Sequence, residues 1–81
     1  MRESYSLTAL IEREGDGYVA LCPELDIASQ GETLEEARSN LQEALQLFYE
    51  VADSKEILDR THSEIFITRI EVAALFLDGA R

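Results

Sequence analysis

The stretch Gln30-Gly-Glu-Thr-Leu-Glu-Glu-Ala-Arg-Ser-Asn-Leu-Gln-Glu-Ala-Leu-Gln-Leu-Phe-Tyr-Glu-Val-Ala-Asp53 decides the fold of this chain. Its apolar residues recur mostly every three or four positions, so they share one side of a helix with about 3.6 residues per turn. They are Leu34, Ala37, Leu41, Ala44, Leu45, Phe48, Val51 and Ala52. We therefore expect an amphipathic helix from about Leu34 to Asp53, with one face made for burial.

The start of this helix is marked by a capping box of the Thr-x-x-Glu form. The Thr33 side chain is expected to accept a hydrogen bond from the Glu36 amide, while the Glu36 carboxylate reaches back to the Thr33 amide. Gly31, just before it, allows a sharp turn into the helix. Thr33 and Glu36 are therefore the predicted helix cap.

Three shorter apolar stretches precede the helix and have the character of strands. Residues 4–13 alternate between apolar and polar side chains, and Tyr18–Cys22 is apolar up to Pro23, which has no amide to donate. The two glycines of residues 14–17 predict a hairpin between them. Residues 24–30 form a weaker third strand.

After the helix, the pattern predicts a short helical turn with Ile57 and Leu58 against the core, then a linker and a strand over Glu64–Val72. Both faces of that strand are apolar, so it needs two covers, and the long helix supplies only one. The second cover is another copy of the chain, a different partner, or a more complex fold. We expect self-association as a dimer or tetramer, because domains of this size often gain stability from a second chain. The predicted oligomer interface is the face with Ile65, Ile67, Arg69 and Glu71.

Together these elements predict an α+β fold: a single small domain over residues 1–81 in the order β-β-β-α-β. The sheet has three to four mainly antiparallel strands, with one long helix packed on one face. The 81 residues include one cysteine, Cys22, so no intrachain disulfide can form, and a lone thiol fits a reducing cytoplasm. The longest apolar run, Val72–Leu77, is too short to span a membrane, and no signal peptide is apparent. A cytoplasmic location is expected.

The chain is strongly acidic, with 17 Asp and Glu against 7 Lys and Arg and a formal net charge of -10. The basic residues are scattered, which argues against nucleic acid and anionic lipid as partners, since phosphate binding needs clustered Lys and Arg. A basic protein would be attracted instead. The candidate surface for such a partner is the polar helix face with Glu43, Glu50 and Asp53. A carboxylate surplus that only maintains solubility explains the charge equally well.

The segments Tyr18–Asp26, Ser29–Ala37 and Asn40–Ala44 resemble the HicB-like antitoxin family. The likeness runs from about Tyr5 to Val51 and continues more faintly through Glu64–Val72. It implies a partial ribonuclease H-like fold that assembles as a dimer or tetramer. It further implies binding of a small basic HicA-like toxin that cleaves messenger RNA. Many members carry a C-terminal DNA-binding segment, but only nine residues follow Val72, so we expect no such module here.

The residues offer little for catalysis. His62 has no Ser or Cys companion at a recognisable spacing, and Cys22 in a strand is more typical of a small buried hydrophobe than of a nucleophile. No cofactor or metal ligand set is apparent. The leading hypothesis is a non-catalytic interaction module, either an antitoxin-like protein that masks a basic toxin or an orphan oligomeric regulator. The alternative is a vestigial metal-dependent nuclease of ribonuclease H-like fold, which would need carboxylates converging on metal ions.

Overall fold

The helix that the capping pattern predicts is the longest element of the computed structural model, which describes residues 5–61 and 64–75. This helix, α1, spans Leu34–Val51. Thr33 is extended, and its side chain accepts from the Glu36 amide at 3.0 Å, as expected. The second half of the predicted capping box is wrong by one residue, because the Glu36 carboxylate accepts from the amide of Glu32 and not of Thr33.

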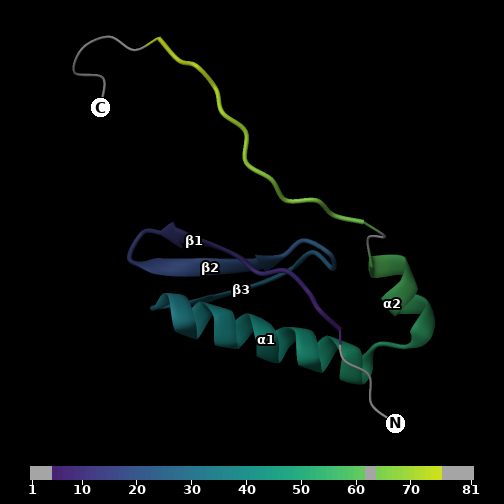
Figure 1. Ribbon diagram of the computed structural model, residues 1–81. Helices are drawn as coiled ribbons and strands as arrows, with labels where there is room; N and C mark the ends of the chain where they lie inside the picture. The colour runs from purple at the N-terminus through teal and green to yellow at the C-terminus, as the bar shows by residue number, and fades with distance from the viewer. Residues whose placement is uncertain (1–4, 62–63, 76–81) are drawn as a thin grey trace.

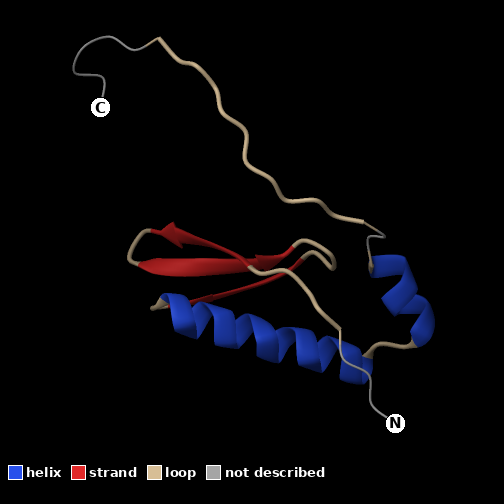
Figure 2. Ribbon diagram, in the orientation of Figure 1, coloured by secondary structure: helices blue, strands red, loops and turns tan. Residues whose placement is uncertain are grey.

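The sheet has three antiparallel strands in the order β1-β2-β3: β1 is Leu10–Glu14, β2 is Gly17–Cys22 and β3 is Ile27–Gly31. Ile11 pairs with Ala20, and Ala20 pairs with Ser29. Helix α1 lies along one face of this sheet (Figures 1 and 2), and it packs mainly against β3 and β2. The α+β class, with three antiparallel strands and one long helix on one face, is therefore confirmed.

The core lies between α1 and the β2–β3 part of the sheet. Its buried side chains are Ala20, Cys22, Leu25, Ala37 and Leu41. Leu25 enters this core from the turn between β2 and β3, where the amides of Leu25 and Asp26 both donate to the Cys22 carbonyl. The helix contacts β3 and β2 much more than β1.

The predicted first strand is longer than the observed one. Within residues 4–13, only those from Leu10 onward join the ladder with β2, and the described residues 5–9 continue outward without a strand opposite. The reason is that β2 ends at Cys22, where the chain turns away at Pro23. Ladder hydrogen bonds need a partner strand, and that partner is missing beyond this point.

A second short helix, α2 (Ser54–Arg60), follows α1, with Asp53 as its N-cap. Arg60 ties α2 to the core: its guanidinium donates to the Leu25 carbonyl at 3.0 Å and lies 5.4 Å from the centroid of the Phe48 ring. The predicted packing of Ile57 and Leu58 is half right. Ile57 is half-buried, whereas Leu58 is 75% exposed because it lies on the solvent side of this short helix.

The predicted strand Glu64–Val72 is not formed in the single chain. Residues 64–75, called the tail below, are extended but pair with no strand among the described residues, and they run away from the sheet (Figure 1). The molecule is consequently 59 Å long but only 28 and 18 Å across. The apolar tail side chains are largely exposed: Phe66 83%, Ile67 54%, Ile70 81%, Val72 76% and Leu75 99%. The residue pattern predicts a strand here. In the single chain the segment is extended, but no partner strand lies beside it among the described residues.

Candidate interaction site

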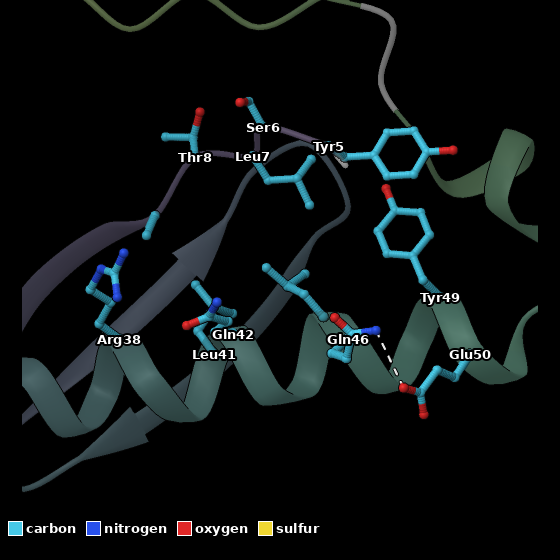
Figure 3. A pocket seen from close by; sticks show the side chains of 12 residues that line it. Tyr5, Ser6, Leu7, Thr8, Arg38, Leu41, Gln42, Gln46, Tyr49 and Glu50 are labelled. Carbon is cyan, nitrogen blue, oxygen red and sulfur yellow. Dashed lines mark hydrogen bonds between the residues drawn. The ribbon is translucent and has the colours of Figure 1, made fainter. Parts of the chain in front are cut away.

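An open groove of about 720 Å³ runs between the N-terminal segment and the exposed flank of α1 (Figure 3). Residues 5–9 form one wall, and the helix forms the other wall and the floor. The helix residues that line it are Arg38, Leu41, Gln42, Leu45, Gln46, Tyr49 and Glu50. The groove exists because the N-terminal segment leaves the ladder with β2 and passes over the helix as a separate strand-like wall.

Glu24 fixes the position of this wall. Both carboxylate oxygens of Glu24 accept from the Thr8 amide, at 3.0 and 3.2 Å, and Oε2 also accepts from the Thr8 hydroxyl at 2.7 Å. Partial burial alone would raise the pKa of the Glu24 carboxyl, but the hydrogen bonds from Thr8 outweigh it and the pKa lies below the ordinary glutamate value. The negative carboxylate therefore replaces the missing strand partner of Thr8.

The end of the groove nearest α2 is closed by stacked aromatic rings. The ring centroids of Tyr5 and Tyr49 are 5.1 Å apart and the planes differ by 4°, and Phe48 meets Tyr49 edge-on at 5.5 Å. Figure 3 shows the two tyrosines facing each other across the groove end. Burial, and to a lesser extent the neighbouring Tyr5, raises the pKa of the Tyr49 hydroxyl. Tyr49 is thus a neutral packing residue that holds the two walls together.

The groove has a charge at each end and apolar side chains between them. Arg38 lies near one end of the lined stretch of α1 and Glu50 near the other (Figure 3). Leu7, Leu41 and Leu45 lie between them. The Glu50 carboxylate accepts from the Gln46 side chain at 3.3 Å, and Glu50 remains exposed. Such a surface can accept an extended apolar segment that carries a positive charge at its Glu50 end.

The residues predicted to meet a basic partner are only partly brought together. Glu43 and Glu50 line a shallow groove of about 540 Å³ on the β3 side of α1, beside Leu47, which is 58% exposed. Asp53 is not part of it, because its carboxylate caps α2 and accepts from the Glu56 amide at 2.8 Å. The acidic surface therefore consists of two carboxylates flanking an exposed leucine.

The predicted oligomer interface lies on the tail. Ile65 is half-buried, and Ile67, Arg69 and Glu71 are exposed. The role of these four residues in assembly stays a prediction, because the structure describes a single chain. The groove is not predicted by the sequence pattern, although the alternation from Tyr5 to Ile11 together with the stop at Pro23 indicates that the first strand extends beyond its partner.

Cys22 is fully buried and its thiol donates to the Glu24 carboxylate at 3.4 Å. Burial is the main cause that raises the pKa of this thiol, and the nearby negative Glu24 raises it further. A thiol in this state is a poor nucleophile.

His62 lies outside the described residues. In the part of the chain that the structure describes, no three or more His, Cys, Asp and Glu side chains are grouped so as to hold a metal ion. Within those same residues no helix is long and apolar enough to cross a membrane.

Comparison with known proteins finds three relatives that share the name UPF0150 protein. The chain is 34% identical over 68 residues to a UPF0150 protein of Helicobacter pylori (strain J99), and the match covers 83% of this chain and 94% of that protein. Two UPF0150 proteins of Synechocystis sp. are 47% identical over 51 residues and 50% identical over 46 residues. These matches cover 60% and 54% of this chain, and they span only 65% and 64% of the two Synechocystis proteins. No family model and no solved structure matches the chain.

Proposed function

Because the chain belongs to the UPF0150 family, we propose that it is a non-catalytic, cytoplasmic protein-interaction module of the HicB-like, antitoxin-like kind. The observation that carries the proposal is the tail, a 12-residue extended stretch (residues 64–75) whose apolar side chains are mostly exposed. An extended segment that makes no backbone–backbone hydrogen bond among the described residues, and that exposes apolar side chains on both faces (Ile67 on one, Phe66 and Ile70 on the other), is a template for pairing with another chain. The tail is therefore the segment through which this protein binds another chain.

Self-association is the first part of the proposed function. The tail face with Ile65, Ile67, Arg69 and Glu71 is its interface, and the assembly is a dimer or tetramer. Exposed apolar patches mark interaction sites in soluble proteins. The small core, with five buried side chains among the described residues, also leaves a thin stability margin that a second copy would raise.

Binding of a small basic protein is the second part. The acidic groove of Glu43, Glu50 and Leu47 combines negative charge with an exposed apolar anchor, and the net charge of -10 draws basic proteins to the whole surface. A basic ribonuclease toxin held there would have its RNA-facing surface covered. Where no such toxin exists, the same module acts as an orphan oligomeric regulator.

Titration calorimetry with a small basic ribonuclease encoded beside this chain tests the second part. Wild-type protein is expected to bind and to inhibit cleavage of RNA, and the charge reversal Glu43→Lys is expected to weaken binding at least tenfold. Glu12→Lys, an exposed reversal on β1 away from the acidic groove, serves as the matched control. The antitoxin-like role is refuted if the folded protein does not bind such a ribonuclease, or if both reversals weaken binding equally.

The non-catalytic part is tested separately with RNA and an RNA–DNA hybrid in the presence of Mg²⁺ or Mn²⁺. No cleavage above a buffer control is expected. Cleavage that is retained through purification and abolished by a chelator would favour the vestigial nuclease instead.

A further inference from the structure

Among the residues that the structure describes, two extended segments lack a strand partner. One is the outer wall of the groove: among the described residues, Ser6–Ala9 make no backbone ladder bond, Leu7 packs against the core, and the Thr8 amide donates to the Glu24 carboxylate. The other is the tail, which likewise makes no backbone–backbone bond within the described chain. Unpaired backbone donors and acceptors of an exposed extended segment are available to a further strand. Each segment offers what the other one lacks.

The accessible side chains of the groove and of the tail match in order and spacing. Along α1, Leu45 is half-buried in the groove, and Glu50 follows about 7.5 Å further along the helix axis, at 1.5 Å per residue. On one face of the tail, Ile67 and Arg69 are about 6.6 Å apart, the two-residue repeat of a strand. An apolar side chain followed by a basic one is therefore available for an apolar side chain followed by an acidic one.

The match holds in one direction only. With Ile67 at Leu45, Arg69 reaches the Glu50 end of the groove. In the reverse direction, Arg69 falls at the Arg38 end of the groove and two positive charges meet. The tail must therefore run in the same direction as α1.

The direction of the tail relative to the outer wall follows from this. Tyr5 stacks on Tyr49 near the Glu50 end, so Ser6–Ala9 run back towards Arg38, against the direction of α1 (Figure 3). A tail that follows α1 is antiparallel to this wall. Antiparallel pairing is the arrangement of the other strands in this sheet.

We propose that the groove between Ser6–Ala9 and α1 binds the tail of a second copy of this chain, antiparallel to Ser6–Ala9 and with Arg69 at Glu50. The occupant is a second copy because the tail leaves α2 in a direction away from its own sheet and keeps Phe66, Ile70 and Val72 exposed there. Two copies that exchange tails form two equal contacts, as a two-fold dimer requires. The inference rests on the self-association part of the proposed function and adds the receiving surface.

Disulfide trapping between two full-length variants tests the position of the tail. An equimolar mixture of Ile67→Cys and Gln46→Cys, oxidised mildly, is expected to give a cross-linked dimer, because Gln46 is exposed beside Leu45 in the groove. Leu47→Cys, exposed on the flank of α1 that lines only the acidic groove, is the matched control and is expected to give no more cross-link than wild-type protein. Equal trapping of both helix positions overturns the proposal.

A charge swap tests the direction. Arg69→Glu and Glu50→Arg are each expected to raise the dimer dissociation constant about fivefold, the upper range for an exposed ion pair, and the double variant is expected to restore it. If the loss of dimerisation free energy in the double variant equals the sum of the losses in the two single variants, the assigned register is wrong.

The outcomes separate this inference from the proposed self-association. If sizing by light scattering finds a dimer but Ile67→Cys never traps Gln46→Cys, the groove is not the receiving surface, although self-association stands. A single chain that carries both Ile67→Cys and Gln46→Cys is tested as well. If it cross-links only within a monomer, the tail docks on its own chain, and both the groove assignment and the proposed self-association are overturned. A wild-type monomer at all concentrations also overturns both.

Discussion

Replacement of Glu24 by glutamine is expected to lower the stability of the domain by about 2 kcal/mol. The Glu24 carboxylate accepts from the Thr8 amide at 3.0 Å and from the Thr8 hydroxyl at 2.7 Å, and hydrogen bonds to a charged group contribute about 1.5 to 3 kcal/mol each. Glutamine keeps one acceptor oxygen but turns an NH₂ group towards donors. Because the carboxylate is only partly buried and one bond can persist, the expected loss is close to that of one such bond.

Urea unfolding followed by circular dichroism measures this loss, with all variants at the same protein concentration because self-association raises apparent stability. A loss of about 2 kcal/mol corresponds to a fall of roughly 10 °C in the melting temperature of a domain of this length. Glu43→Gln, on the exposed face of α1, is the control and is expected to change stability by less than about 0.5 kcal/mol. The clamp is refuted if Glu24→Gln behaves like Glu43→Gln.

The pH dependence of the stability loss in Glu24→Gln is a second, independent test of the interaction between Glu24 and Thr8. The pKa of Glu24 is lower in the folded protein than in the unfolded chain, so the folded state is stabilised above the ordinary glutamate pKa. This contribution is lost as the pH falls through the lowered pKa of the folded state. The stability difference between wild type and Glu24→Gln should therefore be full at neutral pH and shrink in acid. A difference that grows in acid would contradict the assignment.

Three further predictions concern the helix start, its approach to the sheet and the thiol. Thr33→Ala removes the acceptor of the Glu36 amide and should cost about 1 kcal/mol in urea unfolding, whereas Thr33→Ser should be nearly neutral; equal losses would contradict the capping role. Gly31→Ala would place a Cβ 2.5 Å from the Ala37 backbone nitrogen, so we expect a loss of about 1 to 3 kcal/mol, and unchanged stability would show that the helix can shift. Cys22 should react with a thiol reagent only as fast as the domain unfolds, and rapid labelling of the native protein would contradict its burial.

The helix could be predicted from the sequence because its signals are local. The apolar spacing of α1 and the Thr33 cap lie within a few residues of each other, and both are found in the structure. The same kind of signal was present for the second helix, since Asp53 precedes Glu56 by three residues, as Thr33 precedes Glu36. Asp53 was instead assigned to a partner surface, because a carboxylate after a helix also fits an exposed acidic face.

The strand ends and the groove could not be predicted because they depend on residues distant in the sequence. Where β1 begins is set by where β2 turns away, and the position of Thr8 is set by Glu24, 16 residues later. Alternation predicts an extended backbone but does not say which strand lies opposite. For the same reason, Glu64–Val72 has the residues of a strand but no ladder in a single chain.

Amide hydrogen exchange of residues 64–75, measured over a dilution series of the intact protein, tests the central claim most directly. We expect protection of alternate tail amides at high concentration that is lost on dilution, as the second copy leaves the groove. Tail amides that exchange freely at every concentration, or that stay protected independently of concentration, would contradict the claim that another copy of the chain covers this segment.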